Sequence, residues 1–90
     1  MNNISAYLVE FIGTFIFMYV IITTGEAIPI AVTLAAMIYF GGKISGGAFN
    51  PAVTIMLFLN KKIDRMSLLF YLGLQFLAAF LAYRVYLLLK

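Results

Sequence analysis

The chain has 90 residues, of which 66% are hydrophobic and 10% are charged, and it carries a formal net charge of +3. A soluble domain of this size cannot bury so many apolar side chains, which leaves lipid as its natural solvent. The sequence has no Cys, no His and only three carboxylates. This composition argues against disulfides, zinc or haem sites, any other cofactor and enzymatic chemistry. The scattered Lys and Arg residues form no basic tract of the kind that nucleic acid requires.

The first apolar run covers residues 4–22 approximately. At about 1.5 Å per residue it is long enough to cross a hydrocarbon core of roughly 30 Å. It lacks the positive start of a signal peptide and contains Glu10, so we interpret it as a retained membrane span. Glu10 lies too deep in the run for its short side chain to reach the interface, which is the alternative interpretation. An ionisable residue inside a span is a candidate functional residue.

Two further apolar runs follow, over about residues 28–42 and 66–86. Pro29 suits the first turn of the shorter run, because a proline lacks the N–H that would be unpaired there. The last run is interrupted by Gln75. This amide is a candidate site residue, although a hydrogen bond between helices without any role in function would explain it equally well.

Positive charges flank the segment of residues 44–60 on both sides, with Lys43 before it and Lys61, Lys62 and Arg65 after it. The turn between the first two runs has no positive charge. The positive-inside rule then places both flanks, and with them the N-terminus, in the cytoplasm. A segment whose two ends lie on one side of a membrane must be re-entrant.

The centre of this segment reads SGGAFNPAVT. Asn50 is a preferred N-cap, and Pro51 fits the first helical position. The following helix of about ten residues would measure roughly 15 Å, half the hydrocarbon thickness, and would place Asn50 near the midplane. The irregular backbone of residues 45–49 must then be buried in protein or line a watery cavity. Gly46 and Gly47 permit the unusual dihedral angles that such a backbone needs.

This segment combines carbonyl acceptors with the amide donors and the positive dipole end of a helix. A pore for a neutral polar solute typically has a row of carbonyl acceptors followed by amide donors. The positive end of a helix dipole beside them repels cations. An Asn-Pro pair alone is also a common helix start in any protein. The pore hypothesis therefore depends on the motif, its re-entrance and its half-bilayer length together.

Three motifs resemble one family in order and spacing. ISGGAFNPAVT (44–54) resembles the first pore loop of the aquaporins and glycerol facilitators, the major intrinsic proteins. VEFIGTF (9–15) is similar to their first span, and YLGLQFLAA (71–79) to their third. The match covers the N-terminal half of that family. It implies an all-α membrane protein with three transmembrane helices and one re-entrant half-helix, over residues 1–90 as a single repeat.

The resemblance also implies roles for particular residues. The Asn50 amide would donate a hydrogen bond to the permeating molecule, and Glu10 and Gln75 would support the loop backbone. Ile30 falls at the outer constriction, where an aliphatic side chain suggests a less narrow or more apolar filter. The residues expected to line or shape the pore are Ile30, Gly46, Gly47, Ala48, Phe49, Asn50, Pro51 and Ala52. Lys43 and Ala48 depart from the His residues that many members have at these positions.

The family builds its pore from two inverted halves, whereas this sequence resembles one. We expect a passive channel for water or small neutral solutes such as glycerol, completed by a second copy or by a partner chain in a homo- or hetero-oligomer. One alternative is a gene fragment or a non-conducting structural or regulatory membrane subunit. Another is a holin-like protein that permeabilises membranes, which would explain the size and hydropathy but not the motifs.

Overall fold

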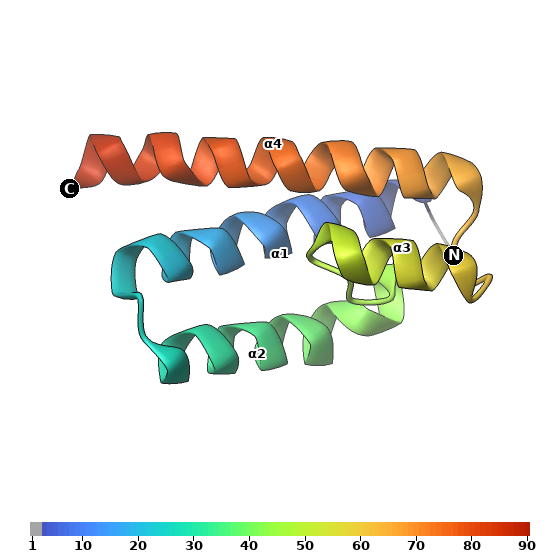
Figure 1. Ribbon diagram of the computed structural model, residues 1–90, viewed down its shortest axis with the longest axis horizontal. Helices are drawn as coiled ribbons and strands as arrows, with labels where there is room; N and C mark the ends of the chain where they lie inside the picture. Colours follow the sequence, from blue (N-terminus) through green and yellow to red (C-terminus); the bar gives the residue numbers. More distant parts are fainter. Residues whose placement is uncertain (1–2) are drawn as a thin grey trace.

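A computed structural model of the chain, which describes residues 3–90, consists of four helices joined by short connections (Figure 1). The helices are α1 (Asn3–Thr24), α2 (Ala27–Ser45), α3 (Pro51–Leu59) and α4 (Arg65–Leu89). Helices α1, α2 and α4 are long and apolar enough to cross a membrane, whereas α3 has only nine residues. The prediction of an all-α membrane protein with three span-length helices and one half-length helix is confirmed.

In the view of Figure 1, the half-length helix α3 lies between α4 and α2, and most of its residues are exposed. Helices α1 and α4 run side by side in the same direction, and α2 runs in the opposite direction. Helix α3 begins near the middle of the molecule and runs to the end where α4 starts. Within residues 3–90, α1 packs against both α4 and α2, α3 packs against α4, and the end of α2 is joined to α4 by the hydrogen bond from the Tyr71 hydroxyl to the Ser45 carbonyl. The start of α3 is therefore held halfway along the molecule.

The long helices extend further than the apolar runs, and the difference matters most in α2. Residues 28–42 were expected as the second span, but α2 continues through Ser45. It ends at Gly46, whose φ of 90° is left-handed and whose N–H donates to the Gly42 carbonyl. A glycine in this conformation is a common helix stop. The irregular segment before α3 is accordingly limited to residues 46–50.

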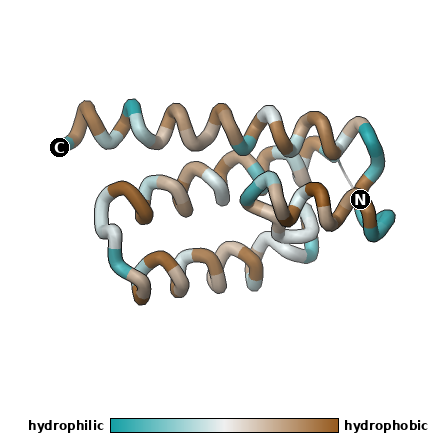
Figure 2. The backbone as a smooth tube through the Cα atoms, in the orientation of Figure 1, coloured by the Kyte–Doolittle hydropathy of each residue, from teal (hydrophilic) through white to brown (hydrophobic). Residues whose placement is uncertain are grey.

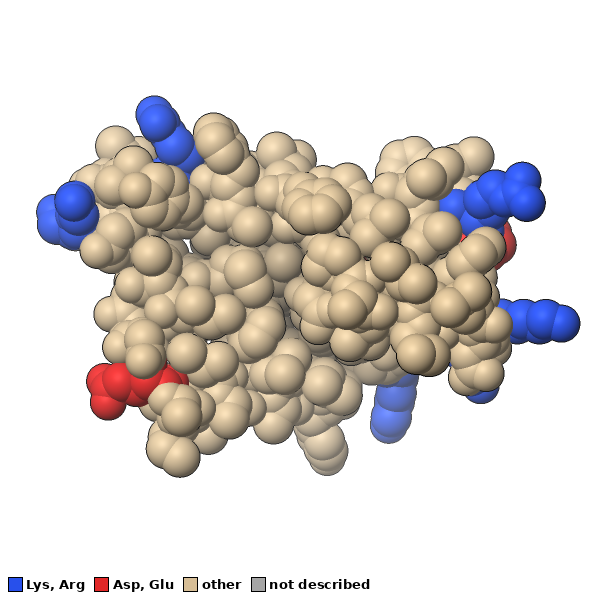
Figure 3. All heavy atoms as spheres, viewed as in Figure 1, with Lys and Arg blue, Asp and Glu red and all other residues tan. Residues whose placement is uncertain are grey.

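The surface of the molecule suits a lipid environment. Apolar residues run along the helices, and the most hydrophilic residues lie at the turns, above all between α3 and α4 (Figure 2). Charged side chains gather towards the two ends of the long axis (Figure 3). The small core contains mostly short side chains, such as Ala6, Ala78 and Ala82. Small residues let helices approach closely, which is how helices associate within a bilayer.

Candidate functional site

Asn50 and the first turn of α3 form the centre of the candidate site. The Asn50 backbone is extended, with φ −157° and ψ 156°, and its Oδ1 accepts a hydrogen bond of 2.9 Å from the Val53 N–H. Pro51 occupies the first helical turn. Since Oδ1 is used by the cap, the half-buried Asn50 side chain keeps its amide Nδ2 as a donor that pairs with no group in residues 3–90. This donor lies beside the positive end of the α3 dipole.

The carboxylate of Glu10 holds the loop that leads to Asn50. The side chain is completely buried, and four groups donate to it. Its Oε2 accepts from Ser45 Oγ at 2.7 Å and from the Ala48 N–H at 3.1 Å. Its Oε1 accepts from the Phe49 N–H at 2.8 Å and from Gln75 Nε2 at 2.9 Å. An ionised carboxylate only accepts hydrogen bonds, so this set of donors matches the charged form.

Gln75 connects Glu10 to α3 rather than to the loop backbone. Its Nε2 also donates to Thr54 Oγ1 at 2.6 Å, and the Thr54 hydroxyl donates to the Asn50 carbonyl at 2.8 Å. The sequence predicted that Gln75 would bond to the backbone of residues 45–49, whereas the structure joins Gln75 to two side chains. Its Oε1 is buried without a partner among the described residues. A continuous chain of hydrogen bonds thus runs from α1 through α4 to the start of α3.

Two supporting residues escaped the sequence analysis, Tyr71 and Thr54. The Tyr71 hydroxyl donates to the Ser45 carbonyl at 2.6 Å, at the end of α2. Both residues are fully buried. The signal that could have found Tyr71 is its spacing, because the buried residues of α4 recur every three or four positions along one face. They are Ser67, Tyr71, Gln75, Ala78 and Ala82.

The loop itself turns through left-handed backbone. Gly46, Gly47 and Phe49 have φ values of 90°, 69° and 58°. The glycines adopt this region without strain, whereas for Phe49 it costs about 1–2 kcal/mol. Ala48 and Phe49, main chain included, are each only 1% exposed, and their N–H groups donate to Glu10. The described residues therefore offer neither of these two expected pore residues to a solute.

The other expected pore residues divide into two places. Pro51 is half-buried and Ala52 is exposed, and both lie next to Asn50 in the first turn of α3. Ile30 lies in the first turn of α2, half-buried, with its N–H bonded to the Glu26 carbonyl at 3.2 Å. That turn is at the end of the molecule opposite to the connection between α3 and α4 (Figure 1). The structure does not bring Ile30 together with Asn50.

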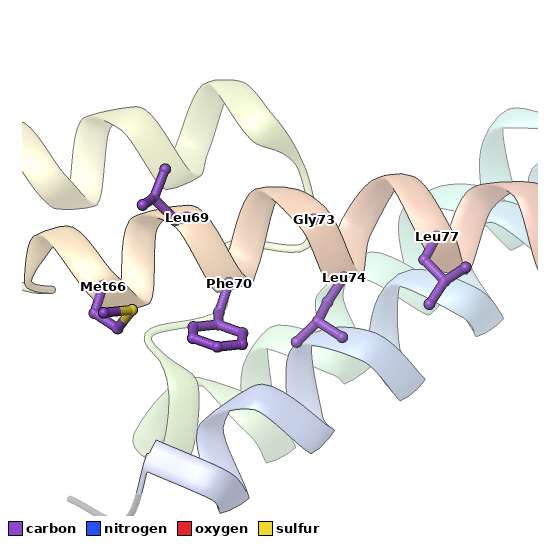
Figure 4. Close-up of a pocket in the computed structure, with 6 residues that line it drawn as sticks. All are labelled: Met66, Leu69, Phe70, Gly73, Leu74 and Leu77. Carbon is purple, nitrogen blue, oxygen red and sulfur yellow. The ribbon is translucent and has the colours of Figure 1, made fainter.

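Two other features of the described residues are poor sites for a polar ligand. Within residues 3–90, no group of three His, Cys, Asp or Glu side chains could hold a metal ion. A groove on α4 presents only apolar groups (Figure 4). The residues that line it are Met66, Leu69, Phe70, Gly73, Leu74 and Leu77. Such a surface suits a lipid chain or another helix rather than a polar solute.

Comparison with known proteins gives a consistent result. The family model described as major intrinsic protein matches residues 22–90. The chain is similar to glycerol uptake facilitator protein-like 6 of Lactiplantibacillus plantarum, with 38% identity over 84% of this chain and 39% of that protein. It is also similar to probable aquaporin PIP1-5 of Arabidopsis thaliana, with 36% identity over 82% of this chain and 32% of that protein. No solved structure matches the chain significantly. The chain thus spans 39% and 32% of the lengths of these two relatives.

Proposed function

Because the chain belongs to the major intrinsic protein family, we propose that it forms half of a passive membrane channel for water or a small neutral solute such as glycerol. The named relatives are a probable aquaporin and a protein like the glycerol uptake facilitators, and each is much longer than this chain. A second half, supplied by another copy or by a partner chain, would complete the pore. Neither a cofactor nor any chemical step is needed for this activity.

The observation that carries the proposal is the start of α3 and its support. A helix of nine residues begins halfway along the molecule, at an Asn whose amide Nδ2 is available as a donor. The loop before it is fixed by a buried carboxylate with four donors. Such fixed backbone is tolerated at membrane depth only where it is buried in protein or lines a watery cavity. The positive dipole end would repel cations, while the amide would bind a neutral polar molecule.

The exposed start of α3 supports the proposal of a second half. Ala52 and Val53, in its first turn, are exposed. The neighbouring Asn50 amide would cost several kcal/mol if it faced hydrocarbon unpaired. A protein surface with a matching polar centre would remove that cost and enclose the passage between the two halves. Either an inverted second copy or a separate chain could supply it.

The membrane orientation is proposed from the charges. The N-terminal end of α1 and the connection between α3 and α4 lie at one end of the molecule (Figure 1). That connection contains Lys61 and Lys62, Arg65 begins α4, and Lys43 lies in the last turn of α2. The opposite end carries only Arg84 and Lys90 among the basic residues. The positive-inside rule places the end with Lys61 and Arg65 in the cytoplasm.

We test the proposal by stopped-flow osmotic shrinkage of liposomes that contain the purified 90-residue chain. We expect fast water flux of low activation energy, without ion leak, that Asn50→Asp alters, because the new charge lies where the solute passes. The control is Asn60→Asp, the same change at the exposed C-cap of α3. It should leave the flux unchanged.

Three other results would limit or overturn this proposal. Shrinkage no faster than that of empty vesicles, from folded and inserted protein, would show that the chain alone forms no channel and would favour a non-conducting subunit. A glycerol or water flux that appears only with a co-purified partner would assign the second half to that partner. Ion leak that survives Asn50→Ala would support a holin-like activity instead.

A further inference from the structure

The aromatic ring of Phe49 occupies a slot between α1 and α2 that two glycines create. A Cβ atom on Gly13 of α1 would lie 2.3 Å from Phe49 Cε1 and 2.7 Å from Cδ1. A Cβ atom on Gly41 of α2 would lie 3.2 Å from Phe49 Cζ and 2.8 Å from Val9 Cγ1. Even one methyl group therefore does not fit on the α1 side of the ring. The ring rests directly on the backbone of α1 and close to that of α2.

The main chain of Phe49 is held as firmly as its ring. Its φ of 58° is a left-handed conformation that a residue other than glycine keeps only when its surroundings enforce it. Its N–H donates to Glu10 Oε1 at 2.8 Å, and its side chain is 1% exposed. The next residue is Asn50, whose extended backbone opens α3. Any movement of the ring is consequently passed to Asn50 through a single peptide bond.

We propose that Phe49 is a positioning residue, whose ring in the slot between Gly13 and Gly41 determines the position of the Asn50 amide. Through that position it determines how the channel discriminates water from larger neutral solutes. The part about discrimination rests on the channel function proposed above. The part about the position of Asn50 does not depend on that function. It can be measured on the chain without any flux.

The geometry also gives the direction of the effect. The Phe49 ring reaches into the slot between the two helices, and the N–H groups of Ala48 and Phe49 donate to Glu10 of α1. The open side of Asn50, next to the exposed Ala52, is the side on which a solute would pass. Added volume in the slot would push Phe49 and Asn50 towards that side. A narrower passage reduces the flux of glycerol more than the flux of water.

The test compares three changes from glycine to alanine within helices. Gly13→Ala places a methyl group against the ring. Gly42→Ala has its nearest neighbour, Ile38 Cγ2, at 3.9 Å, and Gly73→Ala has no atom within 4 Å (Figure 4). All three raise helix propensity in the same way, so the two controls report that effect alone. Each variant of the full chain is reconstituted in lipid, and the Asn50 side-chain amide is followed by nitrogen-15 NMR, beside the ratio of glycerol to water permeability.

We expect Gly13→Ala to move the Asn50 amide resonances and to lower the ratio of glycerol to water permeability severalfold, with both controls unchanged. Phe49→Leu removes the far part of the ring, so the double variant Gly13→Ala with Phe49→Leu should return both readouts towards the wild type. This rescue separates positioning from a general loss of packing, since independent effects would add instead.

Asn50 resonances that stay in place in folded Gly13→Ala would overturn the proposal, as would a double variant whose changes simply add. If Gly13→Ala does not fold, Phe49→Leu alone gives the same test, because it alters the slot without a clash. In that case unmoved Asn50 resonances would again refute the positioning role. If the wild type conducts nothing, the stand-alone channel fails, while the amide measurement still decides whether Phe49 positions Asn50.

Discussion

The two ends of the helix bundle are built on different principles. At the loop end, around Glu10 and the loop of residues 46–50, buried hydrogen bonds join segments that lie far apart in the sequence. At the turn end, between α1 and α2, the hydrogen bonds are local. Thr23 and Thr24 donate to carbonyls one turn back, and the Gly25 N–H donates to the Ile21 carbonyl at 3.0 Å. The structure therefore concentrates its tertiary order around the start of α3.

This difference explains how irregular backbone is held halfway along the long helices. Lipid offers no hydrophobic force between helices, so polar contacts and close packing must fix the loop. Each hydrogen bond to a charged group contributes about 1.5–3 kcal/mol. The turn end needs no such support, because residues 22–28 are exposed and its backbone can bond to water or headgroups. Substitutions of the same kind at the two ends should thus lower the free energy of unfolding by very different amounts.

The largest expected effect comes from Glu10→Gln. The substitution turns two acceptor oxygens into one acceptor and one amide donor, which would face either the Ser45 hydroxyl and the Ala48 N–H or the Phe49 N–H and Gln75 Nε2. Since buried donors lose their partner, we expect a loss of about 3 kcal/mol or more in the free energy of unfolding. Unfolding in detergent micelles, followed by circular dichroism, measures it.

The matched control is the same change at the turn end, Glu26→Gln. Glu26 precedes α2, is exposed, and makes no side-chain bond to the helix start. An exposed substitution of this kind costs within about 0.5 kcal/mol. Equal costs at Glu10 and Glu26 would contradict the contrast between the two ends.

A smaller effect is expected from Tyr71→Phe, which removes one hydroxyl from the loop end. The Ser45 carbonyl would lose a donor at 2.6 Å in a buried place, while the ring would remain. The expected cost is about 1–2 kcal/mol. Tyr19→Phe is the comparison at the other end of α1, since the Tyr19 hydroxyl makes no hydrogen bond within the described residues. A cost for Tyr19→Phe as large as that for Tyr71→Phe would show that the hydroxyl bond to Ser45 contributes nothing specific.

The number and length of the helices could be predicted because they follow from local properties. Three apolar runs and an Asn-Pro helix start specify α1, α2, α4 and α3 without any tertiary information. The boundaries were less predictable, because α2 ends where Gly46 turns left-handed and not where hydropathy falls. The charge of Lys43 indicated that the second span ends before it. A basic residue is favourable in the last turn of a helix, however, and α2 includes Lys43 and continues to Ser45.

The candidate site was predictable where a motif or an isolated polar residue marked it. Asn50 stands out as a helix cap, and Glu10 as a carboxylate inside an apolar run. The partners of Gln75 and the bond from Tyr71 depend on the rotation of α4 against α1, which a nearly uniform apolar sequence does not define. The left-handed Phe49 could not be anticipated either, because a residue other than glycine gives no sequence signal for it. The roles of these residues in a pore stay predictions.

The smallest effect concerns the connection that leads into α4, outside the spans. Asp64 caps α4 by accepting from the Ser67 N–H at 2.8 Å. This backbone hydrogen bond, with a further one from the Ser67 side chain, lowers the pKa of Asp64 below its ordinary value of 3.8. A carboxylate whose folded pKa is lowered stabilises the fold above its unfolded pKa, and this contribution disappears as the pH falls through the folded pKa. Stability should therefore decline as the pH falls below about 4.

Asp64→Asn isolates this contribution, because Asn is an equally good N-cap but does not titrate. The melting temperature of the two proteins, measured in micelles from about pH 6 down to pH 2, should differ slightly at the upper end and converge at the lower end. All other side chains are the same in both proteins, so their effects cancel in the difference. A difference that stays constant over the whole range would mean that the charge of Asp64 adds nothing to its cap. The connection between α3 and α4 would then depend on hydrogen-bond geometry alone, as the turn end does.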